Sequence, residues 1–461
     1  MRIATLFLTY YGFVAYSILN PFIGVLFFVH ITILRPEQLT WGSPAFGRLH
    51  LIAACAVLVG YLFRPRPSQA VIASNFQSGN IFIFGLWVVW LFVGSLLAEY
   101  SVTDSMVKAV DVLKIFVLCF LFARVIGTVF EMNAYIGVVA LTFGFLGLWG
   151  TQQGLSGNDR LDNFWPGGSN LIAAALALVG PVVLAKCFDP ALPIRYRAIF
   201  LGCAATIASC MFFTVSRGGL LGLAAGCGLL LLVLKQRLRV GIAIVFLIVL
   251  ILPWVPDTHM QRLTSTFTPS ESLDVSASSR FVLWELAYRI WLDYPVKGVG
   301  LENFSDVKER YSGKMGDIIK DDVMYYTIFE RKRYPHGLYT GMLAETGAVG
   351  LGLFLALVGR AIISPFPRRF STDEAYRGLY LVAQGGRAGL LGFMVSSFFS
   401  DTQYIEQLYF QIFFLGAVHN FAESLELSAH SSPADPLESS GVFDSTESTA
   451  DGRSGKLVRF Q

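Results

Sequence analysis

The feature that most constrains this chain is a succession of apolar runs, many of them near the ~20 residues that a helix needs to cross a bilayer. Hydrophobic residues make up 54% of the 461 residues and charged residues only 15%, whereas an ordinary soluble domain has ~25% charged residues. This pattern excludes a soluble enzyme, a porin-type barrel and a disordered chain. A net charge of +3 is too small to indicate a nucleic-acid partner. We therefore predict an all-α, polytopic integral membrane protein.

The apolar runs divide the chain into four parts. We predict an N-terminal transmembrane bundle over 1–253, a large external loop with amphipathic helices over 254–340, further transmembrane helices over 341–421 and a disordered tail over 422–461. Together the runs predict about 12 crossings. The tail prediction rests on a composition rich in Ser, Glu, Asp and Pro, which cannot bury an apolar core.

Short loops rich in Lys and Arg indicate the orientation, because such loops are retained in the cytoplasm. Four cationic clusters occupy alternate loops: Arg64 with Arg66, Lys186 with Arg195 and Arg197, Lys235 with Arg237 and Arg239, and Arg368 with Arg369. With these loops in the cytoplasm, the 254–340 loop is periplasmic and the tail is cytoplasmic. The same parity requires the first run, from Ile3 to Leu34, to cross once from a cytoplasmic N-terminus. We expect this run to be an uncleaved anchor with a break at Asn20-Pro21.

Two arginines in the external segments are candidates for binding an anion. The turn Ser216-Arg217-Gly218-Gly219 lies between two apolar runs, so its glycines let backbone amides approach an anion at the start of the next helix while Arg217 adds a fork of donors. The alternative is an arginine that extends to lipid phosphate at the membrane surface.

Arg280 opens a predicted amphipathic helix, for which Ser278 and Ser279 offer an N-cap. An aromatic stripe along this helix suits the outer membrane surface. The helix dipole at this end favours an anion over a cation, so the charge of Arg280 indicates an anionic partner. The alternative is a solvated surface arginine.

His336 is one of six histidines and lies where the large loop re-enters the membrane. Arg331, Lys332 and Arg333 precede it, and a cationic neighbourhood lowers the pKa of a histidine and keeps it neutral, as a general base requires. The alternative is a histidine that merely lies at the membrane interface. Glu345 follows nine positions later, on the opposite face of a straight helix, which argues against a direct His-Glu dyad.

Arg160 is a weaker candidate, because the flanking carboxylates of Asp159 and Asp162 favour an ion pair over a substrate contact. The six cysteines lie within or beside apolar runs without a CxxC pair, and no HExxH, DxD or Cys/His cluster occurs. The sequence therefore indicates no disulfide framework, metal site or nucleotide-sugar site. The Gly298-Val299-Gly300 stretch lacks the preceding strand of a nucleotide-binding motif.

At these residues the sequence resembles the O-antigen ligase family, the membrane glycosyltransferases that move a glycan from a polyprenyl diphosphate onto lipid A core. The resembling segments are RLDNFWPGGSNLIAAALAL from Arg160, SRGGLLGL from Ser216, SSRFVLWELAYRIWLDYPVKGVGLENF from Ser278 and HGLYTGMLAETGAVGLGLF from His336. The N-terminal segment LNPFIGVLFFVHITILRPEQLTWG resembles a subgroup of O-glycosylation ligases associated with exosortase systems.

The resemblance implies a GT-C-like fold in the bacterial inner membrane, with an active site that faces the periplasm. It implies an inverting transfer of O-antigen from undecaprenyl diphosphate to lipid A core in lipopolysaccharide biosynthesis, without a metal, nucleotide or other cofactor. Arg217 and Arg280, and with less support Arg160, would then contact the donor diphosphate, and His336 would be the base.

Three alternatives stay open. An O-antigen polymerase or a protein O-oligosaccharyltransferase would use the same lipid-linked donor with another acceptor. A transporter of the lipid-linked glycan is disfavoured, because transporters usually place polar and broken-helix features at the bilayer midplane, whereas here these features concentrate in an external loop.

Overall fold

The computed structural model describes residues 2–36, 49–63, 75–157, 161, 165, 167–257, 259–260, 275–314, 319, 322–329 and 333–431. Within these residues the secondary structure is helical, without strands. The α-helices are α1 (Arg2–Leu19), α2 (Pro21–Leu34), α3 (Leu49–Phe63), α4 (Asn75–Leu96), α5 (Val102–Val125), α6 (Val129–Leu155), α7 (Gly168–Lys186), α8 (Ile194–Phe213), α9 (Arg217–Val233), α10 (Arg237–Ile251), α12 (Val275–Asp293), α13 (Phe304–Val307), α14 (Asp322–Phe329), α15 (Leu338–Ile363), α16 (Arg368–Thr372), α17 (Arg377–Ser396) and α18 (Glu406–Ser431). Short 3₁₀ helices lie at Leu252–Trp254, Lys308–Lys314, Glu374–Tyr376 and Ser397–Phe399.

The prediction of a polytopic α-helical membrane protein is confirmed. Among the described residues, six helices are long and apolar enough to cross a membrane, namely α4, α6, α7, α8, α10 and α15, and four shorter apolar helices are α1, α2, α3 and α9. Helix length and composition therefore do not reproduce the predicted count of about 12 crossings. The difference arises because several apolar runs form helices shorter than 18 residues, while α5, α17 and α18 carry charged and polar side chains.

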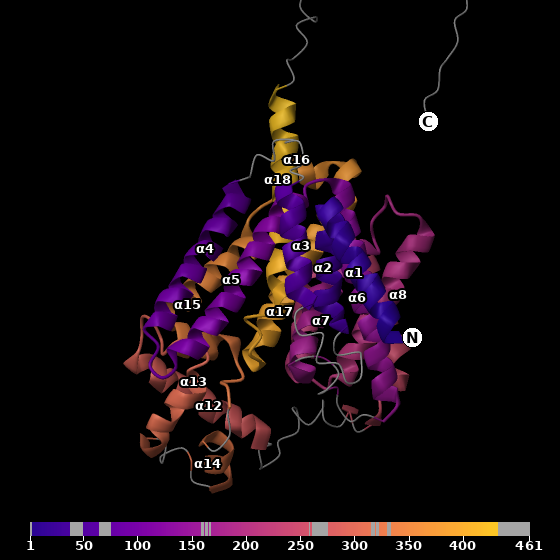
Figure 1. The fold of residues 1–461 in the computed structure, drawn as a ribbon. Coiled ribbons are helices and arrows are strands. Elements are labelled where there is room, and N and C mark those ends of the chain that lie inside the picture. The colour runs from indigo at the N-terminus through magenta and orange to yellow at the C-terminus, as the bar shows by residue number, and fades with distance from the viewer. Residues whose placement is uncertain are drawn as a thin grey trace, which may run out of the picture.

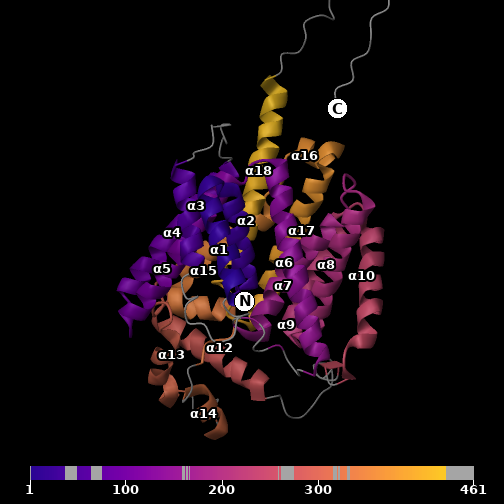
Figure 2. The ribbon, with the colours of Figure 1, turned by 45° about the vertical axis from the view of Figure 1, so that its right-hand side comes forward.

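The helices of the bundle lie side by side, and the two ends of the bundle differ (Figures 1 and 2). Helices α12, α13 and α14 gather at one end, which we call the loop end. Helix α16 and the last turns of α18 lie at the other, which we call the opposite end. The described members of the predicted cationic clusters belong to the α7–α8 and α9–α10 connections and to α16, all at the opposite end. Arg64 and Arg66 fall outside the described residues.

The first apolar run breaks at Asn20-Pro21, as predicted. Asn20 caps α2 by accepting the N–H groups of Phe22 and Ile23, and Pro21 takes the first helical position, where its missing N–H costs nothing. The prediction that this run crosses the membrane only once is wrong, because α1 and α2 form an antiparallel hairpin. The rings of Phe13 and Phe27 stack at 4.9 Å across it.

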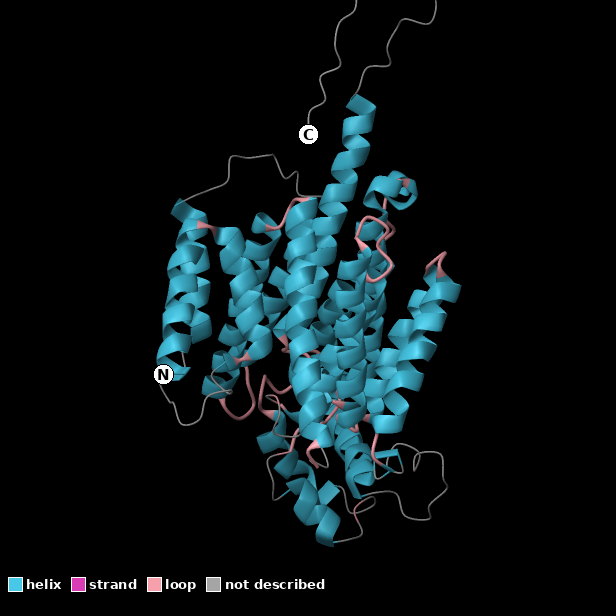
Figure 3. Ribbon diagram, turned by 90° about the vertical axis from the view of Figure 1, so that its right-hand side faces the viewer, coloured by secondary structure: helices cyan, strands magenta, loops and turns pink. Residues whose placement is uncertain are grey.

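The hairpin changes the position of the N-terminus. A β-carbon on Gly24 would lie 2.8 Å from that of Ser17, so only glycine allows the two helices to approach this closely after the turn. Because α1 and α2 run in opposite directions, the N-terminus lies at the loop end of the bundle (Figure 3). The sequence argument placed it at the opposite end, since it treated the break as a kink within one span.

Helix α17 packs against both α7 and α9 through small residues. A β-carbon on Gly389 would lie 1.9 Å from the carbonyl oxygen of Leu178 in α7, and one on Gly222 in α9 would lie 2.4 Å from the carbonyl oxygen of Gly392. Such close backbone approach is typical of transmembrane helix interfaces built from small residues. Since α9 begins and α17 ends at the loop end, this packing places the two termini next to each other.

The α12–α14 region has a small apolar core of its own. Leu283, Leu286 and Ile290 of α12 are buried against residues that include Phe304 and Ile328. The predicted aromatic stripe of α12 is partly exposed, since Phe281 and Tyr288 are 59% and 48% exposed, while Trp284 turns toward the bundle.

Helix α15 is interrupted at Gly347, where φ is +69°. The carbonyl oxygens of Ala344 and Glu345 at the interruption accept the backbone N–H groups of Val299 (2.9 Å) and Gly300 (3.0 Å). A β-carbon on Gly298 would lie 2.4 Å from the carbonyl carbon of Glu345. The Gly298-Val299-Gly300 stretch is therefore a backbone contact that anchors the α12–α14 region to α15.

The chain stays helical beyond the predicted start of the disordered tail. Helix α18 continues to Ser431, whereas composition predicted that order ends at Phe421. Extending an existing helix adds one hydrogen bond for each residue fixed, and Ala, Glu and Leu, which dominate this segment, are good helix formers. The prediction for the remaining residues, 432–461, falls outside the described residues.

Candidate functional site

Four segments that are distant in sequence meet at the loop end: the start of α9, helix α12, the turn before α15 and the turn after α17 (Figure 2). The indole ring of Trp284 lies 6.3 Å from the ring of Phe399. A β-carbon on Gly218 would lie 2.7 Å from Phe399, and one on Gly337 would lie 2.9 Å from Nε1 of Trp284. The two glycines thus permit contacts that a side chain would block.

His336 lies in the turn that precedes α15 and faces Asp401. One carboxylate oxygen of Asp401 accepts the backbone N–H of His336 (3.1 Å) and the other accepts that of Gly337 (3.2 Å). The Nδ1 atom of the imidazole is 3.5 Å from Oδ2 of the same carboxylate. His336 has a φ of +53°, a left-handed conformation that is uncommon for residues other than glycine. Asp401 therefore holds the strained turn through the turn's backbone, and its carboxylate lies beside the ring.

The electrostatics of this pair keep the imidazole neutral. Burial, followed by the positive charges of Arg280 and Arg333, lowers the pKa of His336 from 6.5 to about 4. Burial raises the pKa of Asp401 to about 6, although the N–H groups of Gly337 and His336 and the charge of Arg280 oppose that rise. At neutral pH a neutral base consequently stands beside a carboxylate that is still largely ionised.

The lower pKa agrees with the predicted neutral state of His336, but the cations adjacent in sequence are not its main cause. Burial makes the largest contribution to the lower pKa of His336. Among the cations, Arg280 of α12 contributes more than Arg333. Of the preceding cluster only Arg333 is described, whereas Arg331 and Lys332 fall outside the described residues.

Arg280 lies inside α12 and does not open it. The helix already begins at Val275, so the predicted N-cap at Ser278 or Ser279 is wrong. Adjacent serines are an ambiguous start signal, because serine is also tolerated within helices. The argument from the helix dipole therefore no longer applies to Arg280. Its positive charge instead acts on His336 and Asp401, which brings it into the same small volume.

Arg217 is the first residue of α9, as the sequence predicted. The hydroxyl of Ser216 accepts the N–H of Gly219 (3.2 Å) and donates to Oδ1 of Asn170 near the start of α7 (2.9 Å). A β-carbon on Gly219 would lie 2.5 Å from that of Ala173, so glycine allows the two helix starts to pack together. The N-termini of α7 and α9 thus present two positive dipole ends at the loop end.

The structure brings three of the four predicted site residues to one end of the bundle. The charge of Arg280 acts on His336. Arg217 is adjacent in sequence to Gly218, which packs closely against Phe399. Arg160 falls outside the described residues.

Glu345 does not contribute to this pair. Its carboxylate is buried and accepts the N–H of Phe304 at 3.4 Å. The sequence argument against a His-Glu dyad agrees with this placement, although the helix begins only at Leu338 and His336 precedes it.

Asp401 is not among the site residues that the sequence predicts. The available signal is a lone carboxylate in an otherwise uncharged stretch, FFSDTQYI, between two apolar runs. A lone carboxylate indicates a site residue only once the packing of α17 places the turn beside His336.

The described residues contain no group of three or more His, Cys, Asp or Glu side chains that could hold a metal ion. The two cations that lower the pKa of His336 are arginines, Arg280 and Arg333, and arginine binds phosphate oxygens through paired N–H donors. In chemical terms the arrangement offers a neutral base, an orienting carboxylate and positive charge for an anionic group.

Two segments of the chain match known family models. Residues 202–355, which include Arg217, Arg280 and His336, match a family model described as O-antigen ligase. Residues 1–158 match a family of unknown function. The search of curated proteins finds no match to the chain.

Proposed function

Because residues 202–355 match a family model described as O-antigen ligase, we propose that the protein is an inverting glycosyltransferase that transfers O-antigen polysaccharide from undecaprenyl diphosphate to lipid A core. The observation that carries this proposal is a neutral His336 beside Asp401, with the charge of Arg280 acting on both. A polyprenyl diphosphate donor is already activated, so the protein has to supply only a base, charge stabilisation and orientation.

In the proposed reaction, His336 takes the proton of the acceptor hydroxyl. Nδ1 of His336 is the atom near Asp401, so an Nδ1–H tautomer directed at the carboxylate leaves Nε2 free to accept that proton. The acceptor oxygen then attacks the anomeric carbon from the face opposite the diphosphate. The bond from the anomeric carbon to the diphosphate oxygen breaks, its electron pair stays with the leaving diphosphate, and the configuration inverts.

Arg217 and Arg280 are proposed to bind the donor diphosphate and to stabilise the charge that grows on it. Arginine suits this task because its planar fork of donors binds phosphate bidentately. The paired N-termini of α7 and α9 add positive potential at the same end. Arg160 is proposed as a further contact, because the segment that contains it connects α6 with α7.

The loop end is proposed to face the periplasm and the opposite end the cytoplasm of a bacterium, in the inner membrane. This orientation follows from the cationic connections of the opposite end, since Lys and Arg are retained in the cytoplasm. It also suits the substrates, because glycan transfer to lipid A core requires an extracytoplasmic acceptor site. No nucleotide or metal takes part in the proposed reaction.

The decisive experiment incubates the purified protein with one undecaprenyl-diphosphate-linked glycan and, separately, lipid A core, a second lipid-linked glycan or a pilin-like protein. Transfer to lipid A core alone supports the ligase, whereas extension of the second glycan indicates a polymerase and transfer to protein indicates an oligosaccharyltransferase. Donor that crosses a proteoliposome membrane without transfer would indicate a transporter. The anomeric configuration of the product tests the inverting mechanism independently of the acceptor.

The same proposal has a cellular test. A deletion strain of a lipopolysaccharide-producing host should lose long-chain lipopolysaccharide and retain lipid-linked O-antigen. Loss of the lipid-linked donor as well would place the defect before ligation and contradict the proposal.

A further inference from the structure

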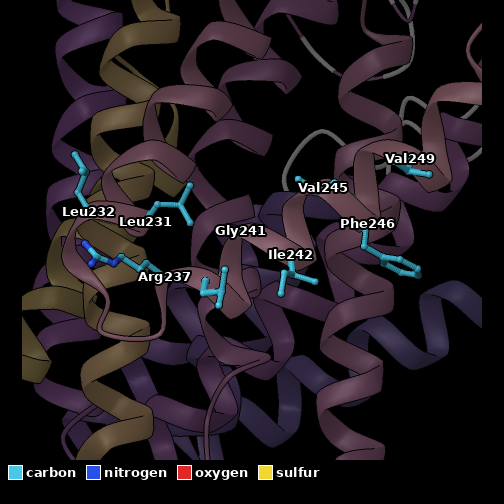
Figure 4. Close-up of a pocket in the computed structure, with 9 residues that line it drawn as sticks. Leu231, Leu232, Arg237, Gly241, Ile242, Val245, Phe246 and Val249 are labelled. Atoms are coloured by element: carbon cyan, nitrogen blue, oxygen red, sulfur yellow. The ribbon is translucent and has the colours of Figure 1, made fainter.

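A groove runs between α9 and α10 on the outer surface of the bundle (Figure 4). Its volume is about 890 Å³. The residues that form its walls are apolar: Leu231 and Leu232 from α9, and Ile242, Val245, Phe246 and Val249 from α10. In α10 only Val240, Leu247 and Ile251 are buried, so most of this helix leaves its side chains uncovered. A surface of this composition in a membrane protein is suited to hydrocarbon.

The groove has the length of one bilayer leaflet. From Arg237 to Val249, helix α10 rises about 18 Å at 1.5 Å per residue, which is a little more than half of the ~30 Å hydrocarbon core. One acyl chain that extends from the membrane surface toward the midplane would lie against α10 along this length, with Leu231 and Leu232 of α9 beside it at the end near Arg237. The groove is therefore matched in length to a phospholipid of the leaflet at the opposite end.

The groove carries positive charge at one end only. Arg237 lines it and is the first residue of α10, and Lys235 and Arg239 are exposed beside it. Within the part of the chain that the structure describes, Arg237 forms no ion pair. The sequence contains no Asp or Glu from Pro190 to Pro256. An anion that neutralises Arg237 therefore has to come from outside these elements.

We propose that the α9–α10 groove binds one anionic phospholipid, with its phosphate on Arg237 and an acyl chain along Ile242, Val245 and Val249. The glycan donor is not the occupant. Arg217 lies at the other end of α9, whose 17 residues rise about 25 Å. A donor with its diphosphate on Arg217 would have its head group at the loop end, whereas this groove presents its charge at the opposite end. The lipid site is accordingly independent of the proposed transfer reaction.

Native mass spectrometry of the full-length protein in detergent tests the proposal. The probes are phosphatidylglycerol and phosphatidylcholine with identical acyl chains, added at increasing concentration. We expect the wild-type protein to retain one phosphatidylglycerol in preference to phosphatidylcholine. Arg237→Gln should weaken phosphatidylglycerol binding by about fivefold, the size expected for one cation beside an anionic lipid, and should leave phosphatidylcholine binding unchanged.

Two further variants distinguish lipid binding in the groove from nonspecific association with positive charge on the surface. Arg368→Gln removes an exposed arginine at the same end and should change neither lipid. Val245→Trp fills the groove from a position that is 60% exposed, so the protein should still fold while the affinity for both lipids falls.

Three results would overturn the proposal. Equal losses in Arg237→Gln and Arg368→Gln would show that phosphatidylglycerol associates with the charged end in general. Unchanged lipid binding in Val245→Trp would exclude the groove as the acyl-chain site. A protein dimer that forms without lipid and dissociates in Val245→Trp would show that a second copy of the chain occupies the groove.

Discussion

Arginines occur at both ends of the bundle, but their surroundings differ. At the loop end the charge of Arg280 lowers the pKa of His336 and opposes the rise that burial causes in the pKa of Asp401. At the opposite end Arg237 and Arg368 are exposed and, within the described residues, carry no ion pair. Positive charge alone therefore does not identify the site. What distinguishes Arg280 from Arg237 and Arg368 is a titratable neighbour whose pKa it changes.

The largest test of the two-ended arrangement is whether each end is reachable from outside the cell. With the native cysteines replaced, Lys314→Cys should react with a membrane-impermeant maleimide in intact cells, and Ser440→Cys should be protected. Protection of Lys314→Cys together with labelling of Ser440→Cys would reverse the orientation.

The N-terminus gives a second, sharper version of this test. The α1–α2 hairpin predicts that Arg2→Cys is labelled from the same side as Lys314→Cys. A single crossing of the first run, as the positive-inside parity suggested, predicts the opposite. Protection of Arg2→Cys in intact cells with a labelled Lys314→Cys would show that the hairpin does not form in the membrane.

Removing the base should have the largest effect on turnover. A positioned general base contributes about 10²- to 10⁴-fold, so His336→Ala should lower transfer by that range while donor binding is retained. His336→Gln can donate and accept hydrogen bonds but cannot take the proton, and it should be nearly as slow. Near-normal transfer by His336→Gln, or a product that keeps the anomeric configuration of the donor, would leave His336 as a positioning residue only.

Changing the shape of the cation at the loop end should have the next largest effect. Arg217→Lys and Arg280→Lys keep the charge but lose the bidentate fork, and each should lower transfer by about 10²-fold, as for the loss of one donor to a developing charge. The matched control is Arg368→Lys at the opposite end, which should transfer at the wild-type rate. Wild-type turnover in both loop-end variants would exclude a diphosphate contact.

Asp401 should contribute less than the base that it orients. Asp401→Asn preserves size and one acceptor oxygen but loses the charge beside Nδ1 of His336, so we expect transfer to fall by about tenfold, a part of the effect of the base itself. Because the proposed role is orientation, kcat should fall more than KM changes. An equal loss in a His336→Gln background would contradict the coupling, because Asp401 would then act without the imidazole.

The smallest expected effect is a shift of the pH profile. Protonation of Asp401, whose pKa is about 6, should lower kcat/KM by the about tenfold expected for Asp401→Asn. Protonation of His336, whose pKa is about 4, should lower it further below about pH 5 and produces the acid limb of the profile. Arg333→Gln removes a cation that lowers this pKa, so the acid limb should move to higher pH. Arg368→Gln serves as the control. An acid limb in Arg333→Gln that does not move to higher pH would show that Arg333 does not lower the pKa of His336.

Local features of the structure were predictable from residue types. The break at Asn20-Pro21 follows from a capping side chain and a missing N–H, and the start of α9 at Arg217 follows from a serine cap and two glycines. Both signals act over a few residues, so the sequence contains them completely. The start of α12 was missed because Ser278 and Ser279 are compatible with a cap and with a helix interior.

The hairpin of α1 and α2 was missed for a different reason. A break in an apolar run fixes where a helix ends, but it does not fix the direction of the next helix. The direction depends on contacts such as Phe13 with Phe27 and Gly24 with Ser17, which form only once both helices exist.

By itself, the sequence determined that the chain is a helical membrane protein, that its cationic connections share one end, and that Arg217, Arg280 and His336 are candidates for chemistry. Those conclusions depend on hydropathy, charge and short motifs. Only the tertiary structure decided that Asp401 holds His336, because the two residues are 65 positions apart. They meet through the glycine contacts that pack α17 against α7 and α9. Backbone approach between helices has no local sequence signature, so the site exists only when the helices are packed.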